Sequence, residues 1–465
     1  MPVFKASGFF VPMRTTHIPV SPDWYTVILQ TYANREHGEV TKRSMTMGAI
    51  ARRITRVITA VVCVAVSVGV SVATLHVPTR EGGGERFNPA RYRSDVIADT
   101  VINHTTGVDK TQGTGTAGSP YDNKGYFPEA GYTPSDFHAP CSIWTYRDAE
   151  SVWNCQVSGL QDLDTSSPHV RDVLSDYFVK LLDYGVAGFR VDAVKHMPPE
   201  DVLAIKKLVA KKSGRSMNDI WWTQEVIGDN AEAAEIQPRN YLKTGQVNEF
   251  QYAYRLKSLF SNSLAGGSLS IKDIPQNITD SGKASVFVTN WDTERNNMTL
   301  TYKDGDAYQL ANAFMLAYPY GTPNVFSGYE FHDTDSGAPG ATATSVPDID
   351  CSKDSGWSCT ERWPDVHGMV GWHNVAGDAP LSDWQDDGDN MIAFGRGGRA
   401  FIAINNSVRT RTVTYHTALP AGEYCDVYAS ADCSGSVHVR FDGDATLTVP
   451  AGSAVAFHIA ATRIP

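Results

Sequence analysis

Between residue 95 and about residue 376, short apolar segments alternate with longer stretches whose apolar residues recur every three or four positions. The longer stretches, at 170–184, 199–212 and 307–316, predict helices. The short segments predict strands at 96–102, 186–191, 220–226, 247–250, 286–290 and 324–327. Strands that alternate with amphipathic helices are typical of a parallel sheet with helical crossovers.

Two regions depart from this alternation. Residues 105–168 form a long segment rich in Gly, Ser, Thr, Tyr and Asp between the first two predicted strands, and a loop of that length is usually functional. After residue 376 the predicted strands are short, alternating and separated by Gly, Asp and Pro: 391–394, 400–405, 412–416, 425–428, 437–441 and 445–449. This pattern predicts a separate antiparallel β domain at 377–465.

A basic and apolar leader precedes the predicted strands. Three arginines between positions 52 and 56 are followed by a charge-free apolar run at 57–77, and Ser71-Val72-Ala73 is typical of a cleavage site. This order predicts a secretory signal peptide at 45–80, behind an unassigned extension at 1–44, with Met45 or Met47 as the natural start. The alternative is an uncleaved membrane anchor, because about 20 apolar residues can span a bilayer.

The charge is uneven along the chain. Residues 1–80 carry nine Lys/Arg and three Asp/Glu, whereas the whole chain has a formal net charge of -11. An acidic body argues against a nucleic-acid partner. The basic leader is expected to contact a membrane only transiently, during export.

The seven cysteines agree with export. Cys63 lies in the leader, and the other six form three locally spaced pairs: Cys141 with Cys155, Cys351 with Cys359, and Cys425 with Cys433. Local pairs in an exported chain predict disulfides. Zinc is the competing interpretation, but no pair has a Cys-x-x-Cys spacing or a suitable histidine pattern.

Charged residues gather where predicted strands end. The apolar run 185–191 leads into Arg190, Asp192, Lys195 and His196, which could make a structural ion pair or a catalytic site. Polar residues also occupy the strand ends at 99–104, 222–226 and 287–292. The acids Asp192, Glu225 and Asp292 thus follow three different strands. Glycoside hydrolysis needs such carboxylates on either side of the scissile bond, one of them protonated.

These four segments resemble the four sequence motifs of the α-amylase family, glycoside hydrolase family 13, in particular its secreted actinobacterial and animal-type members. The segments 159–164, 249–254 and 312–321 support the resemblance, which runs from about residue 95 to the C-terminus. It implies a (β/α)8 TIM barrel with an inserted domain B at 105–168 and a C-terminal β-sandwich. It also implies retaining endo-hydrolysis of α-1,4-glucosidic bonds in starch and glycogen.

The resemblance assigns roles to individual residues. Asp192 matches the nucleophile, Glu225 the general acid/base and Asp292 the stabiliser of the transition state. Retaining chemistry predicts carboxyl groups of Asp192 and Glu225 about 5–5.5 Å apart. We expect Arg190 to keep Asp192 ionised, because a neighbouring cation depresses a carboxyl pKa. The residues that match sugar-contacting positions are His104, Arg190, Lys195 and His196.

A calcium site is implied as well. Asn103, Asp162 and the backbone carbonyl of His196 match family ligands, and hard oxygen ligands suit Ca²⁺. Taken by itself, Asn103 could instead cap a loop. Animal-type relatives bind chloride through three positions, of which Arg190 and Asn290 match two. The third position is Glu330, and since an acid repels an anion we expect no chloride requirement.

Two departures qualify these expectations. Trp291 stands where the fourth motif has a histidine that contacts the sugar, and indole offers one donor and more bulk. Nothing in residues 1–94 resembles the first two barrel strands, so we expect an incomplete catalytic barrel at 95–376. The hypotheses are therefore a secreted, monomeric α-amylase that is active or weakly active, a degenerate glucan-binding relative, or an unstable product of a truncated gene.

Overall fold

The computed structural model of the chain describes residues 16–19, 24–27 and 96–463, apart from 108, 110, 116–117, 262–279, 343–346 and 431. The predicted signal or anchor at 45–80 and most of the extension at 1–44 lie outside these residues. Among the residues described, no helix has the length and apolar character needed to cross a membrane.

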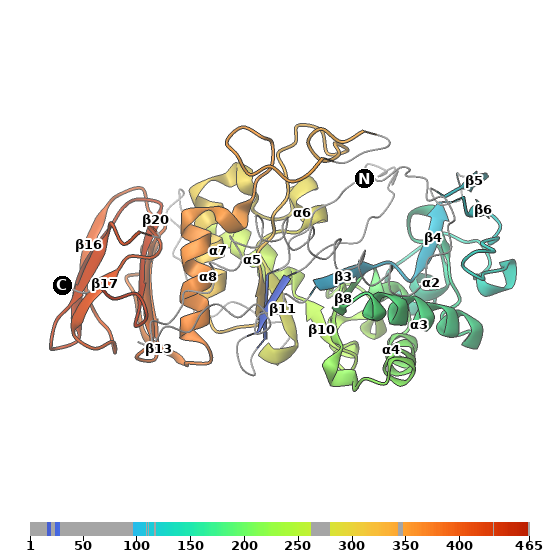
Figure 1. The fold of residues 1–465 in the computed structure, drawn as a ribbon, viewed down its shortest axis with the longest axis horizontal. Coiled ribbons are helices and arrows are strands. Elements are labelled where there is room, and N and C mark those ends of the chain that lie inside the picture. Colours follow the sequence, from blue (N-terminus) through green and yellow to red (C-terminus); the bar gives the residue numbers. More distant parts are fainter. Residues whose placement is uncertain are drawn as a thin grey trace, which may run out of the picture.

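A parallel sheet forms the centre of the molecule (Figure 1). Its strand order is β12-β11-β10-β9-β8-β3, and every neighbouring pair runs parallel. The six strands are β3 (Val96–Thr100), β8 (Val186–Val191), β9 (Trp221–Gln224), β10 (Gln246–Asn248), β11 (Ala284–Phe287) and β12 (Thr322–Asn324). Within the described part of the chain, the parallel sheet thus has the six strands that the sequence predicts. The sheet forms an open half-barrel.

Helices connect the strands and cover the sheet: α3 (Pro168–Asp183), α4 (Pro199–Ser213), α5 (Phe250–Ser261), α6 (Trp291–Arg295), α7 (Asp306–Ala317) and α8 (Pro364–Ala376). The start of α3 is typical: the Ser167 side chain accepts from Val170 N, and Pro168 occupies the first turn. Its Phe178 ring packs 4.6 Å from Phe189 of β8 and 5.0 Å from Trp222 of β9. Burial of these rings fixes the helix against the strands that lead to the candidate site.

A short hairpin lies beside the two edges of this sheet. Strands β1 (Thr16–Pro19) and β2 (Trp24–Val27) pair antiparallel with each other. The backbone of β1 lies near β3, and that of β2 lies near β12. The hairpin forms a separate two-stranded sheet and is not hydrogen-bonded into the parallel one.

The long segment after β3 folds as a small irregular unit at the right of Figure 1. It contains β4 (His104–Gly107) paired with β7 (Leu160–Asp162), and β5 (Gln112–Thr114) paired with β6 (Pro120–Asp122). The helix α2 (Ala149–Asn154) follows, and the disulfide Cys141–Cys155 closes the loop around it. The unit therefore returns its last strand, β7, to the segment that follows β3, where Leu163 N donates to Asn103 O at 2.9 Å.

Two antiparallel four-stranded sheets form the C-terminal region. The first has the order β13-β14-β15-β20, and the second has the order β16-β19-β18-β17. Their strands are β13 (Leu381–Asp386), β14 (Met391–Arg396), β15 (Ala400–Asn405), β16 (Arg411–His416), β17 (Gly422–Cys425), β18 (Ser436–Val439), β19 (Asp444–Val449) and β20 (Ser453–His458). Trp372 of α8 donates its indole N–H to the carbonyls of Phe401 and Phe457, which ties this region to the helices.

Several boundaries differ from the expected ones for local reasons. Strand β12 ends at Asn324, although the sequence predicts a strand at 324–327. Pro323 lies inside it, and a proline is tolerated there because β12 is an edge strand of the parallel sheet. The pattern also missed β13 and β20, and it missed α6, a single turn that Asn290 caps by accepting from Thr293 N.

Candidate active site

Neighbouring parallel strands deliver three of the expected polar residues to one edge of the sheet. In the register of β3 and β8, Asp99 lies opposite Arg190, and Thr100 lies opposite Val191. The pairing continues beyond the strand ends, because Asp192 N donates to Thr100 O at 2.9 Å and Glu225 N donates to Val191 O at 2.9 Å. Asp192 and Glu225 are therefore held side by side by backbone hydrogen bonds.

The Arg190 guanidinium is the centre of the site. Its Nη1 lies 2.9 Å from Asp99 Oδ1 and 2.6 Å from Asp192 Oδ1, and its Nη2 lies 3.0 Å from Glu225 Oε2. The Arg190 side chain is only 6% exposed. One buried cation thus binds three carboxylates, an arrangement that fixes their relative positions as well as their charge.

A strained backbone turn follows Asp192. Ala193 has a φ of 50° in the left-handed region, which an alanine rarely adopts. Its amide donates to Glu225 Oε2 at 2.9 Å. The left-handed conformation of Ala193 costs free energy, and it places the amide that orients the Glu225 carboxyl. Strained residues of this kind are common near active sites.

Burial changes the acidity of the three acids around Arg190. It raises the pKa of Glu225 to about 7, while Arg190 lowers that pKa and Asp192 raises it. Burial also raises the pKa of Asp192 and of Asp99, against the lowering effect of Arg190. The expected depression of the Asp192 pKa by Arg190 is therefore outweighed by burial, which was not readable from the sequence.

Asp292 joins these acids from the first turn of α6. Asp292 is solvent-exposed, but the surrounding protein partly desolvates its carboxyl and raises its pKa to about 6; the charge of Glu225 raises the pKa further, and Arg190 and Arg295 lower it. Asp292 in turn raises the pKa of Asp192 and Asp99. The three predicted acids therefore act electrostatically on one another within one site.

The neighbouring Trp291 is half-buried and packed from two sides. The Arg295 guanidinium lies 3.2 Å from the centroid of its ring, and the Tyr329 ring meets it edge-on at 5.6 Å. Arg295 also donates from Nη1 to the Trp291 carbonyl at 3.2 Å. The indole is thus held by cation–π stacking against the cluster of Tyr329 and Trp357.

Two of the predicted sugar-contacting residues, Lys195 and His196, lie in the short helix η4 (Val194–His196) that follows Asp192. Lys195 Nζ donates to Glu232 Oε2 at 2.7 Å and to Ile227 O at 2.7 Å. Burial lowers the pKa of His196 to about 3 and that of His104 to about 4, so both rings are neutral at neutral pH. His196 Nδ1 lies 3.2 Å from Ala193 O. Because a carbonyl only accepts, Nδ1 carries the proton.

Three oxygen-bearing groups meet near His196. Asn103 Nδ2 lies 2.9 Å from Asp162 Oδ1 and 3.1 Å from His196 O. His138 Nδ1 holds the other oxygen of Asp162 at 2.6 Å. Burial raises the pKa of Asp162 to about 6, and His138 and Asn103 lower it. The structure therefore brings together the three groups that the sequence predicts as metal ligands.

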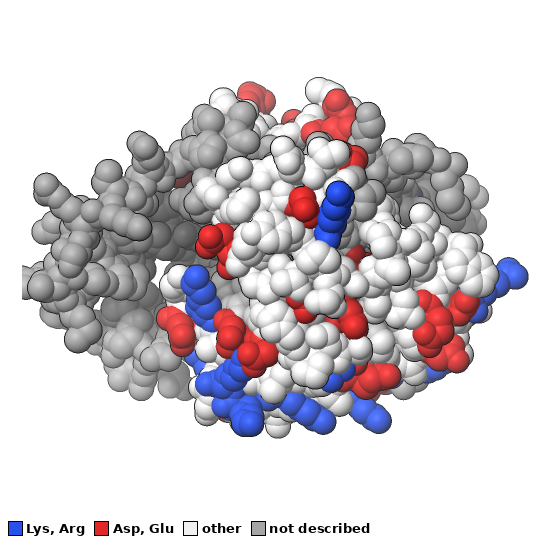
Figure 2. All heavy atoms as spheres, turned by 90° about the vertical axis from the view of Figure 1, so that its right-hand side faces the viewer, with Lys and Arg blue, Asp and Glu red and all other residues white. Residues whose placement is uncertain are grey.

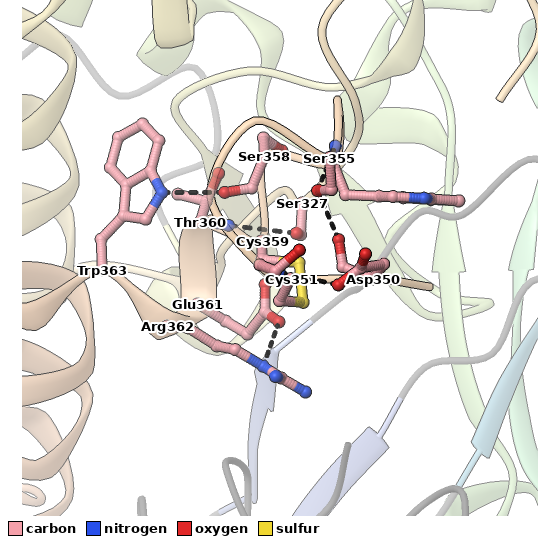
Figure 3. The surroundings of a disulfide bond; sticks show 12 residues. Ser327, Asp350, Cys351, Ser355, Ser358, Cys359, Thr360, Glu361, Arg362 and Trp363 are labelled. Carbon is pink, nitrogen blue, oxygen red and sulfur yellow. Dashed lines mark hydrogen bonds and ion pairs between the residues drawn. A yellow bond between two sulfur atoms is a disulfide. The ribbon is translucent and has the colours of Figure 1, made fainter. Parts of the chain in front are cut away.

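A second cluster of possible ligand atoms, Cys351, Cys359 and Glu361, also lies within 4.8 Å. Figure 3 shows that the two sulfurs are joined in a disulfide, so they are not thiolate ligands. Glu361 faces Arg362, whose Nε lies 3.6 Å away. This cluster is therefore a structural crosslink. All three expected disulfides are present in the structure.

Three functional neighbours were not singled out from the sequence. Asp99 lies inside the first motif, where its spacing to Asn103 was a usable signal. Glu232 and Tyr146 lie in loops, and only the folded chain shows that they contact Lys195 and His196. Tyr146 OH lies 3.1 Å from His196 Nε2, which accepts this hydrogen bond.

Comparisons with known proteins agree with this arrangement. Residues 93–364 match the family described as "Alpha amylase, catalytic domain", and residues 382–460 match "Alpha amylase, C-terminal all-beta domain". An α-amylase of Tenebrio molitor is 37% identical over 394 residues, covering 80% of this chain and 82% of the beetle protein. An α-amylase of Streptomyces violaceus is 41% identical over 79% of this chain, which spans 61% of that relative's length.

Solved structures give the same result. The crystal structure of α-amylase I from Eisenia fetida superposes with a TM-score of 0.69 at 33% identity, covering 77% of this chain and 79% of that protein. The family matches cover both the strand ends that carry the acids and the C-terminal sheets. The chain therefore belongs to the α-amylase family of glycoside hydrolases.

Proposed function

We propose that this chain is an α-amylase that cleaves internal α-1,4-glucosidic bonds of starch and glycogen with retention of configuration. The observation that carries the proposal is the binding of Asp192 and Glu225 to one guanidinium, that of Arg190. Two carboxyls that share one cation lie close together, as the double displacement of retaining enzymes requires. A mutant of the Eisenia fetida α-amylase I has been crystallised with maltohexaose, which supports a glucan substrate here.

In the first step, Glu225 donates its proton to the glycosidic oxygen while an oxygen of Asp192 attacks the anomeric carbon. The bond from carbon to the leaving oxygen breaks, and an ester between the sugar and Asp192 forms. In the second step, Glu225 removes a proton from water, the water attacks the anomeric carbon, and the Asp192 carboxylate is released.

The acidities support this division of roles. A pKa of about 7 leaves a large fraction of Glu225 protonated at neutral pH, as an acid requires. Burial raises the pKa of Asp192 as well, against the lowering effect of Arg190, so its assignment as the nucleophile rests on its position 2.6 Å from Arg190 and on the family motif. Asp292 then holds sugar hydroxyls and stabilises the positive charge that develops on the ring.

Neutral imidazoles and a paired lysine support sugar binding. His104 offers its uncharged Nε2, since its Nδ1 faces Asn103, whereas both nitrogens of His196 are engaged by Ala193 O and Tyr146 OH. Lys195 and Glu232 place a donor and an acceptor beside them. Neutral hydroxyl groups are recognised by such polar atoms. The partner is therefore an α-glucan.

Calcium fits the residues near His196. Asn103, Asp162 and the carbonyl of His196 converge as hard oxygen donors once the Asn103 amide presents its oxygen, and Asp162 supplies a negative charge. A bound Ca²⁺ would join domain B to the loop after Asp192 and neutralise Asp162.

Chloride is not required under this proposal. Glu330 replaces a cation at the third chloride position, and Arg190 already binds three carboxylates.

The remaining properties are inferred from composition and crosslinks. Three disulfides support an exported, extracellular protein, with a signal peptide or a membrane anchor at 45–80. The net charge of -11 supports the absence of a nucleic-acid partner. We infer a monomer whose catalytic region spans 95–376, with domain B at 105–168 and a β-sandwich at 377–465.

A second candidate function is glucan binding with little turnover, and Trp291 is the observation that favours it. A reducing-sugar assay on soluble starch separates the two, with the Asp192→Asn variant as the blank. We expect wild-type protein to release reducing ends and the variant to release none. Equal rates for the two proteins would reject the proposed function. Retardation in a starch gel without turnover would then support the second candidate.

A further inference from the structure

Trp144 exposes an unusually large aromatic surface. Its side chain is 71% exposed, whereas Trp222 and Trp372 are 2% and 0% exposed. Leaving an indole in water forgoes the free energy that its burial would contribute. Exposed aromatic rings that are held rigidly are common contact surfaces for ligands.

The backbone under Trp144 is well fixed. The disulfide Cys141–Cys155 closes this loop, and Ser142 forms a bridge with Gln156 of the returning segment. Trp144 N donates to Ser151 Oγ of α2 at 3.2 Å. The loop that carries the ring is therefore crosslinked and ordered before a ligand binds, which lowers the entropy cost of binding.

The same loop reaches the candidate active site two residues later. Tyr146 OH lies 3.1 Å from His196 Nε2, and Lys195 Nζ lies 4.9 Å from the centre of the Tyr146 ring. Ala233 N donates to Tyr146 O at 2.8 Å. Two residues of extended chain span at most about 7 Å, so the backbone of Trp144 lies close to that of Tyr146, which contacts the predicted sugar-binding residue His196.

The contacts of Tyr146 also indicate the direction of the groove. Ala233 N donates to the Tyr146 carbonyl, and the Lys195 side chain donates from Nζ to the Ile227 carbonyl, so both residues are tied to the loop that follows Glu225. Glu225 is the group that protonates the leaving oxygen in the proposed function. Trp144 therefore extends the groove on the side of the leaving glucan.

We propose that Trp144 is a stacking platform for glucose units on the leaving-group side, and that it gives the enzyme a preference for long glucans. The inference rests on the proposed function. Stacking on a flat indole suits the apolar face of a pyranose ring, and a neutral polymer suits a surface with little charge. Figure 2 shows that the face turned toward the viewer, at the end of the molecule that carries α2, has a broad uncharged area.

The test compares a long and a short substrate. With amylose, we expect Trp144→Ala to raise KM about five- to tenfold, the factor that one lost aromatic contact gives, and to leave kcat near wild type. With 2-chloro-4-nitrophenyl maltotrioside, whose leaving group is a single phenol, the same variant should match wild type. Trp144→Tyr keeps a flat ring and should restore most of the amylose KM.

Tyr184→Ala is the matched control, because Tyr184 is 74% exposed but follows the C-terminal end of α3, before β8 begins. It should leave both substrates unaffected. Equal losses of Trp144→Ala on both substrates, or no loss on either, would overturn the inference. If wild-type protein hydrolyses neither substrate, the proposed function fails. Electrophoresis in amylose gels then tests the stacking platform separately. Weaker retardation of Trp144→Ala than of wild type supports the platform, and equal retardation rejects it.

Discussion

Replacing Arg190 by methionine tests the electrostatic centre of the site. The substitution keeps an unbranched apolar stem and removes the charge that lies within 3.0 Å of Asp99, Asp192 and Glu225. Breaking a buried ion pair by removing one partner costs about 3–5 kcal/mol. Since three buried carboxylates lose their counter-ion here, we expect a loss at the upper end of that range.

This loss should depend on pH in a defined direction. Without Arg190, burial raises the pKa of the three carboxyls further above their unfolded values. Between the unfolded and folded pKa values the native state binds more protons, so its stability falls as the pH rises. The variant should therefore lose most stability at pH 8 and less at pH 5, where the carboxyls are partly protonated.

Differential scanning calorimetry at both pH values measures the effect. About 5 kcal/mol corresponds to a drop in Tm of roughly 5–7 °C at pH 8 for a chain of this length, since the entropy of unfolding is about 2 cal/mol/K per residue. Arg171→Met is the control, because Arg171 pairs with the single carboxylate of Asp201 outside the site and is 25% exposed. It should lower Tm less and keep activity. A Tm for Arg190→Met within 2 °C of wild type at pH 8, or a drop of equal size at both pH values, would refute the reasoning.

Three further predictions concern acidity, Trp291 and calcium. Because Glu225 acts as an acid with a pKa of about 7, kcat should fall as the pH rises above about 7, and a rate that stays flat to pH 9 would contradict its role. Trp291→His restores a sugar-binding donor, so kcat should rise about tenfold or more. Tm should fall, because the stacking with Arg295 is lost. An unchanged kcat would show that the indole does not limit turnover. Chelation with EDTA should lower Tm and added Ca²⁺ should restore it, and Asp162→Asn should abolish that response; a wild-type Tm indifferent to EDTA would argue against the calcium site.

The strand ends were the part of the site that the sequence could predict. Parallel strands deliver their carboxyl ends to one edge of a sheet, so acids directly after predicted strands, such as Asp192 and Glu225, were expected to meet. Contacts between residues far apart in the chain leave no such periodic pattern in the sequence. Glu232 and Tyr146 come from loops whose path depends on the disulfide and on docking against β8 and β9.

The energetics were less predictable than the positions. A cation next to Asp192 in the sequence favours a lowered pKa, but the folded site buries the carboxyl, and desolvation is the larger effect. Likewise, the bulk of Trp291 suggested steric blockage. In the structure the ring is packed between Arg295 and Tyr329, a contact set by the one-turn helix α6 that the apolar pattern does not reveal.

The configuration of the first products tests the central claim most directly. Proton NMR of maltohexaose in the first minutes of reaction, before the anomers equilibrate, distinguishes a double displacement at Asp192 from a single displacement by water. The account predicts products that appear first as the α-anomer and a signal that is lost in Asp192→Asn. Products that appear first as the β-anomer, or no products from the wild-type protein, would contradict it.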